Sequence, residues 1–304
     1  MKQEEEEVIS AAMIRNFKLI VSYDGTRYFG WEHQQETDLT IQGRLETVLT
    51  RMIDGDPSDP VTVIGAGRTD AGVHARAMTC NVLLDTEMTE EEIQLYMNRY
   101  LPEDISVNDV KVCADRFHSR FKACGKTYRY TCWYGNSKPV FDRRYVYVLD
   151  RQPDLDRMRD AAEYMIGMHD FRSFCGNSKM KKSTVRVVDV LRIEESGSYI
   201  RFYVHGNGFL QHMVRIMVGT LLQVGYGEIE PEQVAKIIEA KDRRKAGHTA
   251  PAKGLCLMKV DYRYKSGCRS YERHGRKSDC RSYERNIRND DCCSLEEKAV
   301  TYNI

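Results

Sequence analysis

The sequence is organised around VTVIGAGRTDAGVHARAMTCNVLL, residues 61–84. Both ends of this stretch are rich in β-branched and apolar residues, which predicts two short strands. Between them lie three glycines, Gly65, Gly67 and Gly72, and glycine adopts backbone conformations that other residues avoid. The stretch therefore predicts a tight loop that joins two strands of a sheet.

This glycine-rich loop does not fit the common nucleotide motifs. A dinucleotide fingerprint starting at Gly65 needs its third glycine at position 70, where the chain has Asp70, and a P-loop string is absent. A metal site would pair Asp70 with His74, but no further ligands follow at suitable spacing, so we expect His74 to be structural. Two alternatives remain open from the residues alone. The loop presents Asp70 as a functional carboxylate, or Arg68 and Asp70 form a pair that ties the hairpin together.

The first half of the chain predicts the order β-α-β-β-α-β, the ferredoxin-like split unit. Helix 40–53 has apolar residues at helical spacing, and Thr40 is its expected N-cap. The predicted elements are strands at 17–24, 61–67, 75–84 and 105–114, and helices at 40–53 and 89–101.

The second half repeats this order with one additional helix. The predicted strands are 125–134, two around 184–195 and 198–206, and 255–264, and the helices are 155–167, 209–224 and 231–241. We therefore expect an α+β fold of two related ferredoxin-like halves, with mainly antiparallel sheets and a cleft between them.

Composition and charge agree with one globular protein of this size. The 304 residues carry a net charge of +1, so binding to nucleic acid would need a local basic patch. We expect an acidic extension at 1–14, halves at 15–115 and 116–265, and a repeat-containing, disordered tail at 266–304. With neither a secretory signal nor an apolar run of about 20 residues, we expect a cytoplasmic protein.

Five motifs in colinear order resemble those of the TruA-type tRNA pseudouridine synthases, over residues 15–264. They are GRTDAGVHA (67–75), YDGTRYFGWEHQ with TIQGRLE, LPEDISV with FHSRFKACGKTYRY, GNGFLQHMVRIMVGTLLQVG, and AGHTAPAKGLCLMKVDY. The family fold, two related α/β halves around an RNA cleft, agrees with the duplication inferred from periodicity.

The resemblance implies the reaction and the residues that carry it. Asp70 is implied as the catalytic carboxylate, and whether it attacks the base or acts at the sugar stays open. Tyr128 is implied to stack on the target base and is a candidate to remove the C5 proton. Without the family match it would be a tyrosine packed on a sheet. Arg215, near the edge of an apolar helix face, is the implied partner that holds Asp70 ionised. A surface arginine is the alternative.

The resemblance also implies the substrate, the tRNA anticodon stem-loop at positions 38 to 40, and a homodimer. Arg68 is expected to serve the extruded uridine. The further expected RNA contacts are Arg120, Lys122, Lys126 and Arg129. A solvated charged strand would look the same in sequence. Three positions depart from the family wording: Glu32 and His33 stand where the family often has glutamine and another residue, and Lys126 stands where arginine is frequent.

Making pseudouridine breaks a C–N glycosidic bond and forms a C–C bond at C5, with no redox change or group transfer. The chemistry therefore requires no cofactor, and we expect no metal. A catalytically silent tRNA-binding protein on the same scaffold is the alternative, and it predicts that Asp70, Tyr128 or Arg215 is disrupted. All three are present.

Overall fold

The computed structural model describes residues 14–177 and 179–262, which belong to one structural unit. The acidic extension expected at 1–14 lies outside the described residues except for Ile14, and the repeat tail expected at 266–304 lies wholly outside them.

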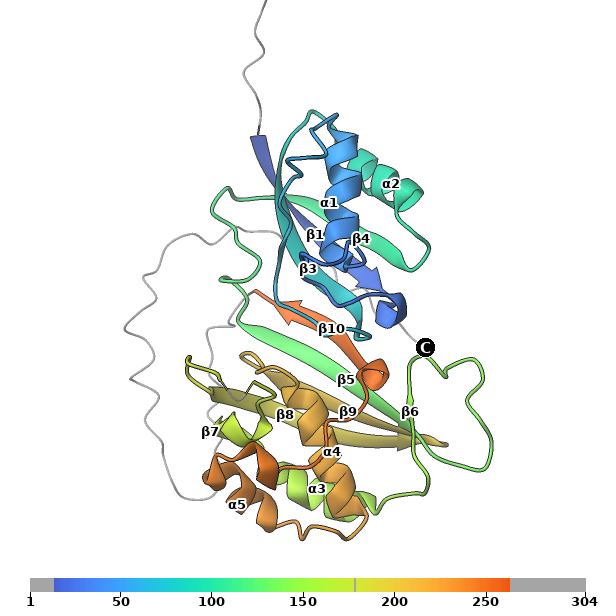
Figure 1. The fold of residues 1–304 in the computed structure, drawn as a ribbon, viewed down its shortest axis with the longest axis vertical. Coiled ribbons are helices and arrows are strands. Elements are labelled where there is room, and N and C mark those ends of the chain that lie inside the picture. Colours follow the sequence, from blue (N-terminus) through green and yellow to red (C-terminus); the bar gives the residue numbers. More distant parts are fainter. Residues whose placement is uncertain (1–13, 178, 263–304) are drawn as a thin grey trace, which may run out of the picture. The chain divides into compact units, whose positions relative to one another are not determined.

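The elements follow the predicted order closely (Figure 1). The strands are β1 (Ile14–Tyr23), β2 (Ile64–Gly65), β3 (His74–Asp85), β4 (Ile105–Cys113), β5 (Gly125–Trp133), β6 (Tyr147–Val148), β7 (Gly167–Asp170), β8 (Val185–Ser196), β9 (Tyr199–Gly206) and β10 (Leu255–Asp261). The α-helices of the described part are α1 (Ile41–Met52), α2 (Glu90–Tyr100), α3 (Leu155–Glu163), α4 (Met213–Gly225) and α5 (Gln233–Ala240). The short strands β6 and β7 were not predicted.

The strands of both halves form a single, mostly antiparallel sheet, which differs from the expected separate sheets. Its order is β4-β1-β3-β10-β5-β9-β8-β7, with β2 on β3 and β6 on β5. The last strand, β10, joins the halves because it pairs parallel with β3 and antiparallel with β5. This insertion satisfies backbone groups that would be free at the edges of two separate sheets.

One face of this sheet carries the core and the helices of both halves. Tyr23, Ala75, Leu257 and Tyr128 are register partners across β1, β3, β10 and β5, so they share this face, and all four are buried. In Figure 1, α1 and α2 cover the part of the sheet formed by β1, β3 and β4, and α3 and α4 cover the part around β5, β8 and β9. Tyr128 therefore lies near the middle of the helix-covered face.

Two helices show how local sequence sets the frame. Thr40 caps α1 as predicted, because its hydroxyl accepts a hydrogen bond from the Gly43 amide at 3.2 Å. Helix α4 is apolar on nearly all sides and is buried along most of its length. A Cβ on Gly219 would lie 2.0 Å from the His248 carbonyl oxygen, so this glycine lets the segment before Ala250 run against the helix. No helix within 14–177 and 179–262 is both long and apolar enough to span a bilayer.

Candidate active site

Asp70 lies in a loop that neighbouring segments hold rigidly in place. The loop joins β2 to β3, and the Asp70 carbonyl accepts the Val73 amide at 3.1 Å to close a turn. Gly72 within this turn has φ +76°, a conformation that favours glycine. The carbonyl oxygen of Thr69 accepts a hydrogen bond from the Trp31 amide at 3.1 Å. The Thr69 side-chain hydroxyl, which is buried, lies 2.8 Å from the Tyr23 hydroxyl.

Gly30, a glycine outside the loop, allows a neighbouring segment to approach the loop backbone at Thr69 closely. Gly30 has φ +102°, and a Cβ there would lie 2.6 Å from the Thr69 carbonyl oxygen. The segment around Gly30 therefore packs directly against the backbone next to Asp70. The turn within the loop and the segment around Gly30 therefore both restrict the backbone at Asp70, as a pre-organised functional carboxylate requires.

Arg215 reaches Asp70 from α4, as expected. Its Nη1 donates to Asp70 Oδ2 at 3.1 Å, and its Nε donates to the Ala250 carbonyl at 2.7 Å. The Arg215 side chain is 15% exposed and that of Asp70 is 29% exposed. The two bonds fix the guanidinium plane, so the position of the Asp70 carboxylate is set by two separate segments of the second half.

His212 is a second group at this carboxylate, and the sequence analysis missed it. Its Nε2 lies 3.5 Å from Asp70 Oδ2. The residue has φ 59° at the N-terminus of α4, a left-handed conformation that is uncommon for residues other than glycine. Gly176 makes room for the ring, because a Cβ there would lie 2.5 Å from His212 Nδ1. The available signal was the spacing: His212 and Arg215 are three residues apart at one helix end.

Both groups meet the same carboxylate oxygen. No hydrogen bond to Asp70 Oδ1 is found within the described residues. The site therefore holds Oδ2 and leaves Oδ1 for a substrate. A carboxylate presented in this way can act as a nucleophile or stabilise a developing positive charge.

Tyr128 is placed beside this carboxylate on the helix-covered face. It is 8% exposed, and its ring packs edge-to-face on Phe209, with ring centroids 5.3 Å apart. Burial raises the pKa of the Tyr128 hydroxyl well above its usual value, and the charge of nearby Asp70 raises it further. The hydroxyl therefore stays protonated at neutral pH in the free protein.

Arg68 is at the surface and already has a partner. Its Nη2 lies 2.5 Å from Glu32 Oε1, and the two side chains are 60% and 44% exposed. Glu32 is one of the positions at which this sequence departs from the family wording. An arginine this exposed is free to exchange Glu32 for a phosphate.

The other expected RNA contacts differ in exposure, and they do not all lie on one face of the sheet. Arg120 and Lys122 are exposed. Lys126 is half-buried and donates to the Ala66 carbonyl at 2.9 Å, in the space that the missing side chain of Gly67 provides. Burial, with a smaller contribution from the charge of Arg120, lowers the pKa of Lys126 to about 8.

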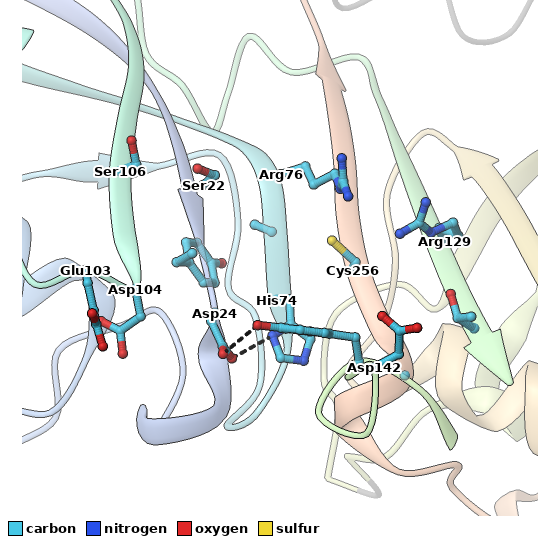
Figure 2. Close-up of a pocket in the computed structure, with 15 residues that line it drawn as sticks. Ser22, Asp24, His74, Arg76, Glu103, Asp104, Ser106, Arg129, Asp142 and Cys256 are labelled. Carbon is cyan, nitrogen blue, oxygen red and sulfur yellow. Dashed lines mark hydrogen bonds and ion pairs between the residues drawn. The ribbon is translucent and has the colours of Figure 1, made fainter. Parts of the chain in front are cut away.

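Arg129 points to the other face of β5, because neighbouring residues of a strand point to opposite faces and Tyr128 is on the helix side. It lines a cavity of about 380 Å³ that contains none of Asp70, Tyr128 and Arg215. Figure 2 shows Arg129 and Arg76 on one side of this cavity and Glu103 and Asp104 on the other. This cavity is therefore separate from the carboxylate site.

Searches against known proteins give a consistent match. The family model described as tRNA pseudouridine synthase matches residues 19–122 and 161–263. Proteins named tRNA pseudouridine synthase A match at 44% identity in Clostridium kluyveri, 43% in Bacillus sp. strain KSM-64 and 46% in Clostridium acetobutylicum. Each of these matches covers 82% of this chain and 100% of the relative.

Proposed function

Because this chain belongs to the tRNA pseudouridine synthase family, we propose that it isomerises uridine to pseudouridine in tRNA with Asp70 as its catalytic carboxylate. The observation that carries the residue assignment is the Arg215–Asp70 ion pair, which holds Oδ2. Oδ1 accepts no hydrogen bond from the described residues. A silent tRNA-binding protein would have no need of such an arrangement.

The reaction cleaves the bond between N1 of uracil and C1′ of ribose. The uracil then turns, C5 bonds to C1′, the C5 proton leaves and N1 gains a proton, so substrate and product have the same atoms. Asp70 Oδ1 adds to the base or to the sugar during this exchange, and the bond that it forms breaks again before the product leaves. Arg215 and His212 both contact Oδ2 and keep the carboxylate in place.

Tyr128 packs against the extruded uracil. The Tyr128 ring packs against Phe209. Because Tyr128 lies near Asp70, a base stacked on its ring would lie next to the carboxylate. The raised pKa of its hydroxyl argues against an ionised phenolate as the base that takes the C5 proton. We therefore assign Tyr128 the stacking role and not the proton transfer.

The finer features of the proposal follow the family. The substrate is the anticodon stem-loop at positions 38 to 40, and the enzyme works in the cytoplasm as a homodimer. Its ferredoxin-like halves, 15–115 and 116–265, lie on either side of the RNA. Arg68 contacts the RNA beside the extruded nucleotide, and Arg120, Lys122, Lys126 and Arg129 add positive charge. Of these four, the exposed Arg120 and Lys122 are the best placed to meet phosphates.

Sequencing of pseudouridine in tRNA tests this function. Unmodified transcripts of several tRNAs are incubated with the protein, and pseudouridine is mapped by carbodiimide modification and primer extension. The proposal expects new pseudouridine at positions 38, 39 or 40. Pseudouridine confined to another arm of the tRNA would contradict the assigned substrate region, and its absence from every transcript would contradict the function.

A further inference from the structure

A cavity of about 370 Å³ lies beside the Asp70 loop and is lined by three cations, Arg143, Arg144 and Lys253, and by no acidic residue. We propose that this cavity binds a phosphate group of the tRNA backbone next to the target nucleotide. The inference rests on the proposed function for the identity of the RNA, and nothing in the sequence analysis pointed to these three residues.

The cavity adjoins both segments that position the ion pair. Gly72, two residues after Asp70, forms part of its wall, and so does Pro251. Pro251 follows Ala250, whose carbonyl accepts the hydrogen bond from Arg215 Nε. A phosphate held here would lie next to the loop that carries the catalytic carboxylate, where an extruded nucleotide needs its backbone fixed.

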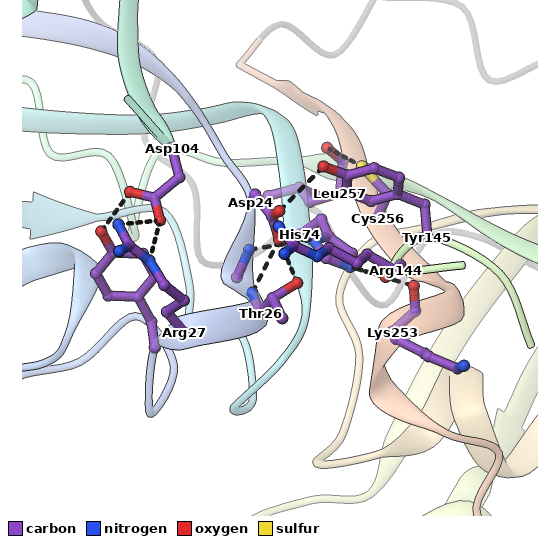
Figure 3. Close-up of polar contacts among 12 residues, drawn as sticks. Asp24, Thr26, Arg27, His74, Asp104, Arg144, Tyr145, Lys253, Cys256 and Leu257 are labelled. Carbon is purple, nitrogen blue, oxygen red and sulfur yellow. Dashed lines mark hydrogen bonds and ion pairs between the residues drawn. The ribbon is translucent and has the colours of Figure 1, made fainter. Parts of the chain in front are cut away.

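His74, from the loop motif at 65–75, supports the wall of this cavity from behind by contacting the backbone of two lining residues. Its Nε2 lies 3.1 Å from the Arg144 carbonyl oxygen and 3.2 Å from that of Lys253, as Figure 3 shows. On the other side of the ring, Nδ1 accepts the Gly25 amide at 3.1 Å. Burial lowers the pKa of His74 against the opposing charge of Asp24, whose Oδ1 lies 3.1 Å from Nδ1. Because Nδ1 accepts the Gly25 amide, the neutral ring donates from Nε2. One buried imidazole therefore links the two loops that supply the cations.

A further contact joins the same loops. Lys253 Nζ donates to the Arg143 carbonyl at 3.3 Å. Side-chain contacts to backbone carbonyls thus hold the two loops together before any ligand arrives, which reduces the ordering that binding requires.

The three charged groups are available for an anion. Their residues are exposed, and no ion pair to any of them is found in the described ranges. Arg143 Nη1 donates to the Val140 carbonyl at 2.6 Å, which leaves its other donors for a ligand. The acid next in the chain, Asp142, accepts a hydrogen bond from the Tyr199 hydroxyl instead. Guanidinium groups suit phosphate because their donors match its oxygens in pairs.

The loop that carries Arg143 and Arg144 favours RNA over a free anion. Phe141 is 93% exposed and Val140 is 59% exposed, and only Asp142 separates them from the two arginines. An exposed aromatic ring beside cations is the combination that binds single-stranded nucleic acid, because bases stack on the ring while the cations meet phosphates.

The salt dependence of tRNA binding tests the proposal. The variant Arg143→Gln/Arg144→Gln/Lys253→Gln is compared with Arg159→Gln/Lys236→Gln/Arg244→Gln, which removes the same charge from α3, α5 and the segment after α5. The dissociation constant for unmodified tRNA is measured by filter binding from about 0.05 to 0.3 M salt. At about 0.1 M salt we expect the cavity variant to bind roughly tenfold more weakly, and its slope against log salt to be shallower by about two.

The proposal is overturned if the cavity variant and the control variant have the same dissociation constant and the same slope. It is also overturned if affinity falls while the slope stays at the wild-type value, because the loss would then not come from phosphate contacts. Tritium release from tRNA labelled at uracil C5 is measured in parallel. If the wild-type protein releases none but the cavity variant still loses affinity and slope, the proposed function fails while the phosphate site stands.

Discussion

Asp70 and Arg215 are 145 residues apart in the chain, and their side chains meet at 3.1 Å. The contact joins a loop of the first half to a helix of the second half. Strand β10 supports the contact, because it pairs with β3 next to the loop and with β5, which carries Tyr128. The carboxylate site therefore exists only when both halves have assembled into one sheet, so folding and the assembly of the site are coupled.

His212 is expected to position Asp70 through Oδ2. His212→Leu should slow single-turnover tritium release roughly tenfold, because one of the two groups at Oδ2 is lost. His212→Asn should recover much of that loss, since asparagine tolerates the left-handed backbone and keeps a donor. Gly176→Ala should also slow the reaction, because its Cβ would displace the ring. His169→Leu, on β7, serves as the control.

The tRNA dissociation constant distinguishes this role from a structural one. Positioning predicts that the His212 variants change the rate far more than tRNA affinity or the melting temperature. Equal rates for the leucine and asparagine variants would show that the imidazole donor is not used.

The two possible roles of Tyr128 predict opposite results for Tyr128→Phe. If the ring stacks on uracil, phenylalanine should keep most of the rate, and Tyr128→Leu should lose roughly 10- to 100-fold. If an ionised phenolate removes the C5 proton, phenylalanine should be as inactive as leucine. Single-turnover rates of the two variants at saturating tRNA decide between them.

The Arg68–Glu32 ion pair is expected to compete with RNA. Glu32→Gln should tighten tRNA binding up to about fivefold at low salt, since exposed pairs contribute about 1 kcal/mol or less. The gain should vanish in an Arg68→Gln background. Glu36→Gln removes the same charge from an exposed position nearby and is the matched control. An equal gain from Glu36→Gln would mean that general repulsion, and not the pair, is responsible.

Lys126 should make stability depend on alkaline pH. Burial lowers its pKa to about 8, below the ordinary value of 10.5, so between these pH values the unfolded chain binds more protons. The free energy of unfolding therefore rises with pH across this window. Relative to Lys126→Met, the wild type should gain about 2–3 kcal/mol between pH 7.5 and 10.5. Urea denaturation of both proteins measures this difference, and a constant difference would contradict the buried position of the ammonium group.

Periodicity and capping in the sequence were enough to predict most of the fold. The order of the longer strands and helices was right because their apolar patterns are strong, and Thr40 marked its helix start. Strands of two and four residues, β6 and β7, are too short to show a period. The joining of both halves through β10 was missed because strand pairing between distant segments leaves no local pattern.

For the site, residue patterns narrowed the opening loop to a presented carboxylate or a structural pair, and the family resemblance pointed to Arg215. His212 was missed because its left-handed backbone and the space left by Gly176 are tertiary features. The same holds for helix α4, which begins at Met213 and not at 209, because the turn ending at His212 precedes it. Arg129 and Tyr128 are neighbours in a strand, so their side chains point to opposite faces of the sheet. The sequence was therefore enough to predict that Arg129 faces away from Tyr128.

Tritium release by Asp70→Asn tests the central claim most directly. Asparagine keeps the size of the side chain but cannot act as a carboxylate, so we expect release from C5-labelled tRNA to fall below detection. Binding of tRNA, measured on the same preparation, should stay within a few fold of the wild type. Release at the wild-type rate by Asp70→Asn would contradict the assignment of Asp70 as the catalytic carboxylate.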